Sequence, residues 1–155
     1  MSEFGANGAE KDLYDFYFMG GIKPGRREKV ESLYEVLKND GYRCKFFFVD
    51  KSKSYMSYSK NIEIIKQSKC LIELTQDNQK GLTLRAMEAL KYKRKLITTN
   101  QTIANYSFYH KDNIFVLGID DWSTIRSFIQ TQYRPIPEEI VKDYDINSWL
   151  TKILS

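Results

Sequence analysis

The stretch that decides the fold of this chain covers residues 80–100 and reads KGLTLRAMEALKYKRKLITTN. Three apolar residues recur at the spacing of one helical face and predict a helix over residues 81–93: Leu84, Met87 and Leu90. The apolar run after this helix predicts a strand over residues 96–99. Gly81 allows the backbone to approach a ligand closely, and the N–H groups of the first helical turn favour an anion. The stretch therefore predicts a ligand site at a helix start, and an ordinary packed amphipathic helix is the alternative.

Strands and helices alternate on both sides of this stretch. The apolar pattern predicts strands over residues 13–19, 42–49, 70–74, 96–99 and 114–117, with helical patterns between them. After Pro135 and Pro137 a terminal helical segment is expected, with an apolar face formed by Trp149, Leu150, Ile153 and Leu154. This alternation predicts an α/β fold, namely a Rossmann-like three-layer α/β/α arrangement with a mainly parallel sheet. Residues 1–11 lack periodicity and read as a flexible leader or cloning scar, so residues 12–155 are expected to form a single domain.

Three predicted loops follow strands and are therefore expected to share one crevice at the carboxyl edge of the sheet. Gly20 and Gly21 permit close backbone approach to a phosphate, and Arg26 supplies positive charge beside them. The polar loop around Tyr55 is the second, and the turn after residue 75 is the third. The residues expected to bind substrate at that third turn are Lys80, Gly81, Leu82 and Thr83. A turn of two glycines that serves only the backbone is the structural alternative at Gly20.

Composition narrows the functional classes. The net charge of +4 is modest and the basic residues are scattered, so nucleic-acid binding is not indicated. The basic cluster at residues 91–95 is expected to be a solvated helix end, with attraction to an anionic substrate or membrane as the alternative. Cys44 and Cys70 lie in apolar runs and are expected to be buried free thiols of a cytoplasmic protein. One histidine, His110, leaves no basis for a histidine metal site, so no metal is expected.

The whole ordered pattern resembles the C-terminal, nucleotide-sugar-binding half of a retaining GT-B glycosyltransferase of bacterial lipopolysaccharide or capsule biosynthesis. Residues 88–90, Glu-Ala-Leu, are a variant of the family's Glu-Ala-Met, and residues 18–26 resemble its diphosphate-binding segment. The resemblance implies that Glu88 bonds the donor ribose and that Arg26 stands at the place of the diphosphate-binding Lys. Gly21 stands at the place of the family's Arg. Lys80 replaces the first Glu of the family's motif, which usually faces the transferred sugar, so catalytic residues are not assigned.

The same resemblance sets the expected partners. It implies a nucleoside-diphosphate sugar as substrate, no separate cofactor, and an N-terminal acceptor-binding domain in the full-length protein or in another chain. The expected location is cytoplasmic, at the inner face of the membrane, with peripheral association of the full enzyme. Because the acceptor half is missing from these 155 residues, the chain alone is expected to transfer little or no sugar.

Two other functional classes fit the same alternation of strands and helices. The first is a signalling or interaction module of the TIR or flavodoxin-like kind, in which Asp15 and Glu73 would be the acids of interest. The second is a nucleotide-binding domain without catalysis. The interaction module gives no role to the turn at Gly81 or to Glu88, whereas a donor-binding domain uses both.

Overall fold

The computed structural model of the chain describes residues 12–21, 25–49, 56–75 and 81–145. The expected leader and the apolar residues of the terminal segment, Trp149 to Leu154, lie outside these ranges, as do Tyr55 and Lys80. By their contacts the residues fall into two compact units, one within residues 1–72 and the other within residues 73–155. Each unit is described by itself.

Within the described ranges five strands form the sheet, in the order β2-β1-β3-β4-β5. Their bounds are β1 (Tyr14–Gly21), β2 (Cys44–Val49), β3 (Ser68–Glu73), β4 (Lys95–Thr98) and β5 (Ile114–Val116). β1 pairs in parallel with β2 and with β3, and β4 pairs in parallel with β5. Helices follow the strands, as parallel connections require. The predicted Rossmann-like α/β fold with a parallel sheet is thereby confirmed.

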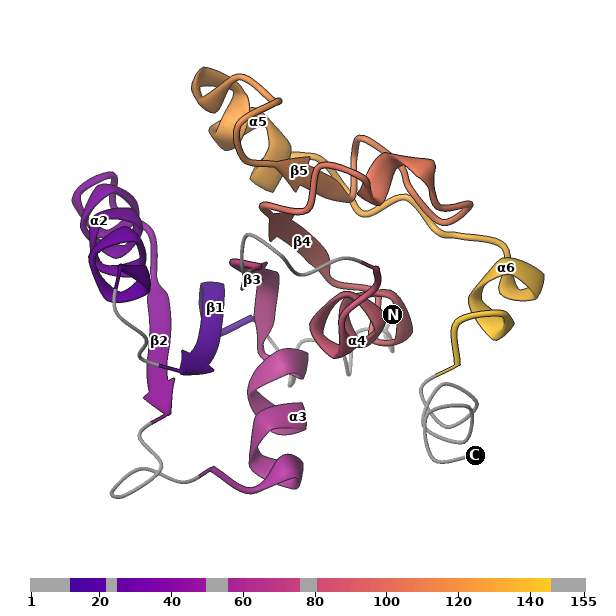
Figure 1. The fold of residues 1–155 in the computed structure, drawn as a ribbon, viewed down its shortest axis with the longest axis horizontal. Helices are drawn as coiled ribbons and strands as arrows, with labels where there is room; N and C mark the ends of the chain where they lie inside the picture. The colour runs from indigo at the N-terminus through magenta and orange to yellow at the C-terminus, as the bar shows by residue number, and fades with distance from the viewer. Residues whose placement is uncertain (1–11, 22–24, 50–55, 76–80, 146–155) are drawn as a thin grey trace, which may run out of the picture. The chain divides into compact units, whose positions relative to one another are not determined.

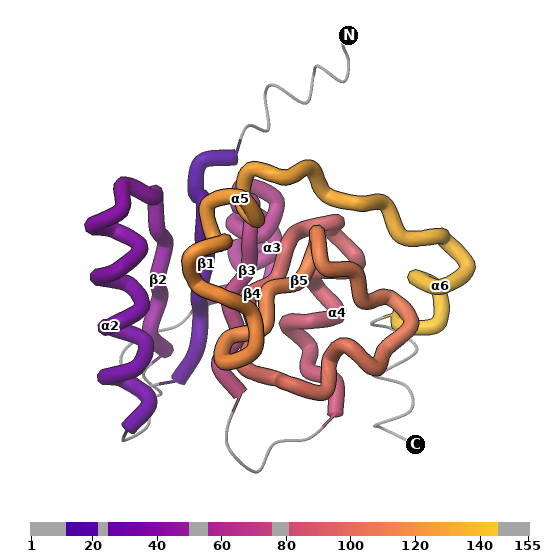
Figure 2. Tube along the Cα trace, turned by 90° about the horizontal axis from the view of Figure 1, so that it is seen from above, coloured from indigo at the N-terminus to yellow at the C-terminus, as the bar shows by residue number. Residues whose placement is uncertain are grey.

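In the first unit two helices cover the strands. α2 (Arg26–Asn39) and α3 (Tyr58–Lys66) lie on opposite faces of β1 and its neighbours (Figure 1). Phe18 on β1 lies with its ring centroid 5.6 Å from that of Phe46 on β2, and the Phe46 ring in turn packs against Tyr34 of α2 at 5.0 Å. Tyr17, the next residue along β1, points to the other face, where its hydroxyl donates to Asn61 Oδ1 at 2.7 Å. Figure 2 shows the order α2, β2, β1 from another side.

The structure corrects the expectation for Gly20 and Gly21. Both were expected in a turn after the first strand, but both are strand residues, paired in parallel with Phe48 and Val49 of β2. The ladder hydrogen bonds of β2 stabilise an extended backbone that glycine by itself does not favour. The residue with left-handed backbone is Gly25, at φ +82°, which directly precedes α2.

The second unit contains β4, β5 and several short helices. α4 (Leu84–Lys91) and α5 (Ile125–Gln130) lie on opposite faces of the two strands (Figure 1). The remaining elements are the 3-10 helices η1 (Ile103–Asn105) and η2 (Trp122–Thr124) and the helix α6 (Glu138–Lys142). Phe115 of β5 packs against Phe128 of α5 at 5.6 Å between ring centroids. These aromatic contacts form the core on that side of the unit.

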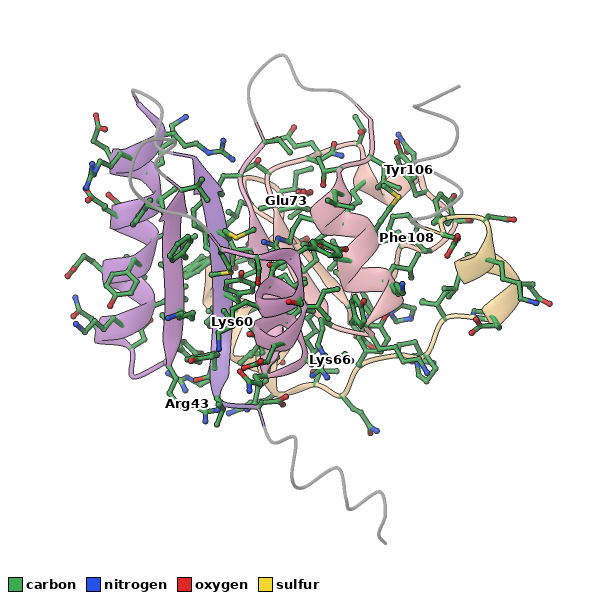
Figure 3. All side chains as sticks on the ribbon, turned by 90° about the horizontal axis from the view of Figure 1, so that it is seen from below. Arg43, Lys60, Lys66, Glu73, Tyr106 and Phe108 are labelled. Atoms are coloured by element: carbon green, nitrogen blue, oxygen red, sulfur yellow. The ribbon has the colours of Figure 1, made fainter. Side chains whose placement is uncertain are left out.

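The residues just after α6 are attached to the loop after β4 by aromatic packing. The rings of Phe108 and Tyr144 meet edge to face at 4.9 Å, and Ser107 Oγ lies 3.1 Å from the Tyr144 hydroxyl. Figure 3 labels Phe108 and its neighbour Tyr106. The chain between α5 and α6 is held by Asn113, whose side chain donates to Arg134 O and accepts from Arg134 N. These two hydrogen bonds fix the segment between α5 and α6 to the residue that precedes β5.

Lys95 departs from the expected basic, solvated helix end. It is the first residue of β4, it is 5% exposed, and its ammonium group lies 4.5 Å from the ring centroid of Phe128. The same group donates to the backbone carbonyl of Asp112. Lys91 and Lys93 remain exposed. In the basic cluster at residues 91–95, Lys91 and Lys93 therefore place their charges at the surface, whereas Lys95 is buried.

Candidate functional site

A buried carboxylate marks the carboxyl end of β3. Glu73 is the last residue of that strand and is 7% exposed. Its Oε1 accepts from the hydroxyl of Thr83, and its Oε2 accepts from the hydroxyl of Thr98 at 2.7 Å. Figure 3 shows Glu73 beside α4. A buried carboxylate with two hydroxyl donors is satisfied and held in one orientation.

Each of these two hydroxyls also accepts a backbone N–H. Thr83 is the N-cap of α4, and its Oγ1 accepts from Ala86 N at 3.2 Å. Thr98 Oγ1 accepts from Asn100 N at 2.9 Å. One carboxylate therefore links the first turn of α4 to the loop that follows β4.

Asn100 connects the two loops a second time. Its Nδ2 donates to the carbonyl of Gly81 at 3.4 Å, and its Oδ1 accepts from the backbone N–H and the hydroxyl of Thr102. Gly81 has a left-handed backbone, φ +86°, and a Cβ atom added there would meet no heavy atom within 4 Å. The glycine is thus required by its backbone angle and not by crowding.

A second hydroxyl pair lies at the ends of β3 and β4. Thr75 Oγ1 and Thr99 Oγ1 are 2.8 Å apart, and Thr99 Oγ1 also accepts from Thr75 N at 2.8 Å. Both residues are half-buried. With Glu73, Thr83 and Asn100 they make the carboxyl edge of this unit a surface of hydroxyl and amide groups. This is the edge at which open parallel sheets bind ligands.

The predicted site residues of the second unit have the following places. Gly81 is exposed, Leu82 and Thr83 are half-buried ahead of α4, and Glu88 lies buried within α4. The structure brings Gly81 and Thr83 into the network around Glu73. Lys80 lies outside the described residues.

Glu88 is held by its own helix. It is 2% exposed, and its Oε1 lies 2.9 Å from Nη1 of Arg85, one turn earlier, whose side chain is 10% exposed. A buried carboxylate keeps its charge at acceptable cost when a guanidinium pairs with it. The bond to a donor ribose that the resemblance implies would have to share this carboxylate with Arg85, and it stays a prediction.

Gly20, Gly21 and Arg26 belong to the first unit. The two glycines end β1, and Arg26 begins α2 with a half-buried side chain. No side chain caps the start of α2 among the described residues. The crevice that these residues were expected to share with the turn at Gly81 joins both units and stays a prediction.

Asp15 lies near the amino end of β1, whereas parallel sheets bind ligands at the carboxyl ends of their strands. It is the second residue of β1, where its carboxylate accepts from the backbone and side chain of Arg43 and lies 3.5 Å from Lys69 Nζ. Figure 3 labels Arg43 at the edge where β1 and β2 begin. Burial raises the pKa of Asp15, but the hydrogen bonds and charge of Arg43, helped by Lys69, outweigh it and hold the pKa below its usual value. Asp15 is therefore the centre of an ion-pair cluster with Arg43 and Lys69.

Among the described residues, neither the thiols nor any group of metal-binding side chains forms a second candidate site. Cys44 and Cys70 are both free, as expected; Cys70 is buried and Cys44 is half-buried. Burial raises the pKa of the Cys44 thiol to about 11, so the reactive thiolate is scarce at neutral pH. Within the described ranges, no group of three His, Cys, Asp or Glu side chains is placed to hold a metal ion.

Sequence reasoning missed the central residues of this edge. Glu73 was considered only as an acid of the alternative interaction module, and Thr75, Thr98, Thr99 and Asn100 were given no role. One signal was present: a carboxylate in the otherwise apolar run 70–74 is costly to bury unless donors reach it. The sequence does not reveal which donors reach it, because they come from two other segments.

Comparisons with known protein families, with curated proteins and with solved structures found no match to this chain. In the part of the chain that the structure describes, no helix has the length and apolar character needed to cross a membrane.

Proposed function

We propose that this chain is the nucleotide-sugar donor-binding domain of a glycosyltransferase that acts in bacterial surface polysaccharide biosynthesis. The observation that carries the proposal is the hydrogen-bond network that links Glu73, Thr83, Thr98, Asn100 and Gly81 at the carboxyl edge of the second unit. Glu73, through Thr83 and Thr98, fixes the left-handed Gly81 turn ahead of α4. A fixed glycine turn that leads into a helix presents backbone N–H groups to a phosphate or a sugar oxygen.

The fold is compatible with this proposal. Parallel α/β sheets bind nucleotides at the carboxyl ends of their strands, where the Gly81 turn, Thr75 and Thr99 lie. The resemblance of residues 88–90 and 18–26 adds the chemistry: Glu88 would accept from ribose hydroxyls, and Arg26 would pair with the diphosphate. Fold likeness by itself does not select a function, so the site residues must carry it.

The division of labour in the proposed enzyme follows from what the edge contains. Preorganised hydrogen bonds position a donor, whereas transfer also needs an acceptor held in line and water excluded. We assign the acceptor to a second domain, and the chain alone binds a donor without robust turnover.

The test is a binding panel of UDP, GDP, CDP and ADP by isothermal titration calorimetry, with thermal unfolding as a second measure. A ligand that binds only the folded chain raises its melting temperature by mass action. We expect one nucleoside diphosphate to bind and the others to bind weakly. Absence of binding by all four would favour an interaction module over a donor-binding domain.

Two variants connect binding to this edge. Gly81→Val forces a β-branched residue into a left-handed backbone and should weaken binding of the nucleotide that the parent selects. The matched control is Gly41→Val, because Gly41 also has a left-handed backbone, φ +91°, and no heavy atom within 4 Å of an added Cβ atom, but lies between α2 and β2. Both variants should lose stability, and only the first should lose binding beyond the fraction unfolded.

A further inference from the structure

The chain that follows β4 differs in composition from the rest. Residues 96–109, LITTNQTIANYSFY, contain no Asp, Glu, Lys or Arg, although 28% of the chain is charged. Thr99 and Asn100 are half-buried and Gln101 and Thr102 are exposed, so the loop offers hydroxyl and amide groups at the surface. Asn100 ties the loop to the Gly81 turn. A neutral surface of hydrogen-bonding groups thus lies beside the turn.

The hydroxyl pair of this surface has unused capacity. Thr75 Oγ1 and Thr99 Oγ1 share one hydrogen bond of 2.8 Å, which uses one of their two hydroxyl hydrogens. The N–H of Thr75 occupies a lone pair of Thr99 Oγ1. Among the described residues no acceptor is found for the second hydroxyl hydrogen, so within those ranges the pair has one O–H left to donate and a lone pair left to accept.

We propose that the Thr75–Thr99 hydroxyl pair binds a hydroxyl group of the sugar that the donor carries. This inference rests on the proposed donor-binding function and names the part of the substrate that contacts this edge. A sugar hydroxyl both donates and accepts, as the threonine pair does. A phosphate only accepts and carries charge, which favours cations, and the 96–109 segment contains none. The pair is therefore suited to a neutral, polyhydroxyl group.

The competing reading is that the pair only joins the ends of β3 and β4. The two readings differ in what a hydroxyl deletion changes. A structural pair affects stability and affects all ligands equally, whereas a sugar-binding pair affects only the ligand that has the sugar. A comparison of a nucleoside diphosphate with its own sugar conjugate separates them.

The experiment uses calorimetry on the full chain with UDP, UDP-glucose, UDP-N-acetylglucosamine, GDP and GDP-mannose. In the parent we expect a sugar conjugate to bind more tightly than its free diphosphate. Thr75→Val deletes one hydroxyl but keeps Thr99 Oγ1 as acceptor for the backbone N–H of residue 75. It should weaken the conjugate about 2- to 10-fold, as expected for one neutral hydrogen bond, and leave the free diphosphate unchanged.

Thr99→Val should have the same selective effect, and Thr99→Ser, which restores the hydroxyl, should recover the affinity. The matched control is Thr131→Val, since the Thr131 hydroxyl donates to Ser127 O at 2.7 Å in α5, away from this edge. It should change neither affinity. Equal losses for conjugate and free diphosphate, or no loss in either threonine variant, would overturn the inference and leave the donor-binding proposal standing. Failure of the parent to bind UDP, GDP, CDP, ADP or any of these conjugates would reject both.

Discussion

Arg85 and Glu88 form an ion pair one helical turn apart within α4, with 2.9 Å between Nη1 and Oε1. Their side chains are 10% and 3% exposed, so the pair is far less screened by water than a surface pair. The carboxylate for which the family resemblance implies a bond to a ribose is thus a structural element of its own helix. The effect of a substitution at Glu88 therefore has to be measured both on folding stability and on nucleotide affinity.

Glu88→Gln should lower both stability and nucleotide affinity. The amide keeps one acceptor for Arg85 but removes the charge, and the free energy of unfolding should fall by about 1–3 kcal/mol. If Glu88 accepts from ribose hydroxyls, affinity for the nucleotide should fall about tenfold. Chemical denaturation and calorimetry measure the two effects. Lower stability with unchanged affinity would make Glu88 purely structural and would refute the ribose assignment.

Glu73→Gln should loosen the Gly81 turn. A neutral amide cannot accept from both Thr83 and Thr98 with charge assistance, and one of its N–H groups would face a hydroxyl donor. We expect a loss of about 1–3 kcal/mol in the free energy of unfolding and faster amide hydrogen exchange at residues 84–86 and 100–102. Thr98→Ser keeps the hydroxyl and is the control. Unaltered exchange in those segments would show that the hydrogen bonds of Glu73 do not hold the Gly81 turn.

Asp15 should contribute to stability in a pH-dependent manner. Its pKa in the folded chain lies below the ordinary value of 3.8, so the folded state favours the ionised form. The stabilisation is complete above the unfolded pKa and is lost as the pH falls through the folded pKa, below about pH 4. Denaturation midpoints between pH 2 and pH 7 should show a smaller acid loss for Asp15→Asn than for the parent. A variant as acid-sensitive as the parent would contradict this.

The same variant serves as a control for binding. Asp15 and Glu73 are both buried carboxylates, 8% and 7% exposed, at strand ends of opposite polarity. Asp15→Asn should reduce stability without reducing nucleotide affinity at neutral pH, whereas Glu73→Gln should reduce both.

Arg26→Ala should weaken diphosphates more than monophosphates. It removes a cation proposed to pair with the diphosphate, so the remaining affinity should also depend less on salt. Calorimetry with UDP and UMP at 50 mM and 300 mM salt measures this. Arg27→Ala, the neighbouring residue, whose guanidinium pairs with exposed Glu31 at 3.1 Å, is the control. Equal losses in the two variants would indicate a general charge effect and no specific contact.

Local sequence determined the succession of elements. Val30, Leu33 and Leu37 recur at the spacing of one helical face and predict α2. The run Asn-Asp-Gly at residues 39–41 predicts the end of this helix, and Gly41 there has a left-handed backbone, φ +91°. The apolar runs predict all five strands to within a few residues, because burial on both faces of a parallel sheet requires nearly continuous apolar sequence. Alternation of these elements was sufficient to predict the α/β class.

Tertiary structure decided the rest. Gly20 and Gly21 are strand residues because β2 supplies hydrogen bonds that no local propensity indicates. The partners of Glu73 stand 10 and 25 residues later in the chain, so only packing brings their hydroxyls to its carboxylate. Lys95 leaves the solvated end of a helix and is buried because β4 begins there and Phe128 covers it. Hydrophobic periodicity is local and can be read along the chain, whereas the satisfaction of a buried polar group depends on contacts between distant segments.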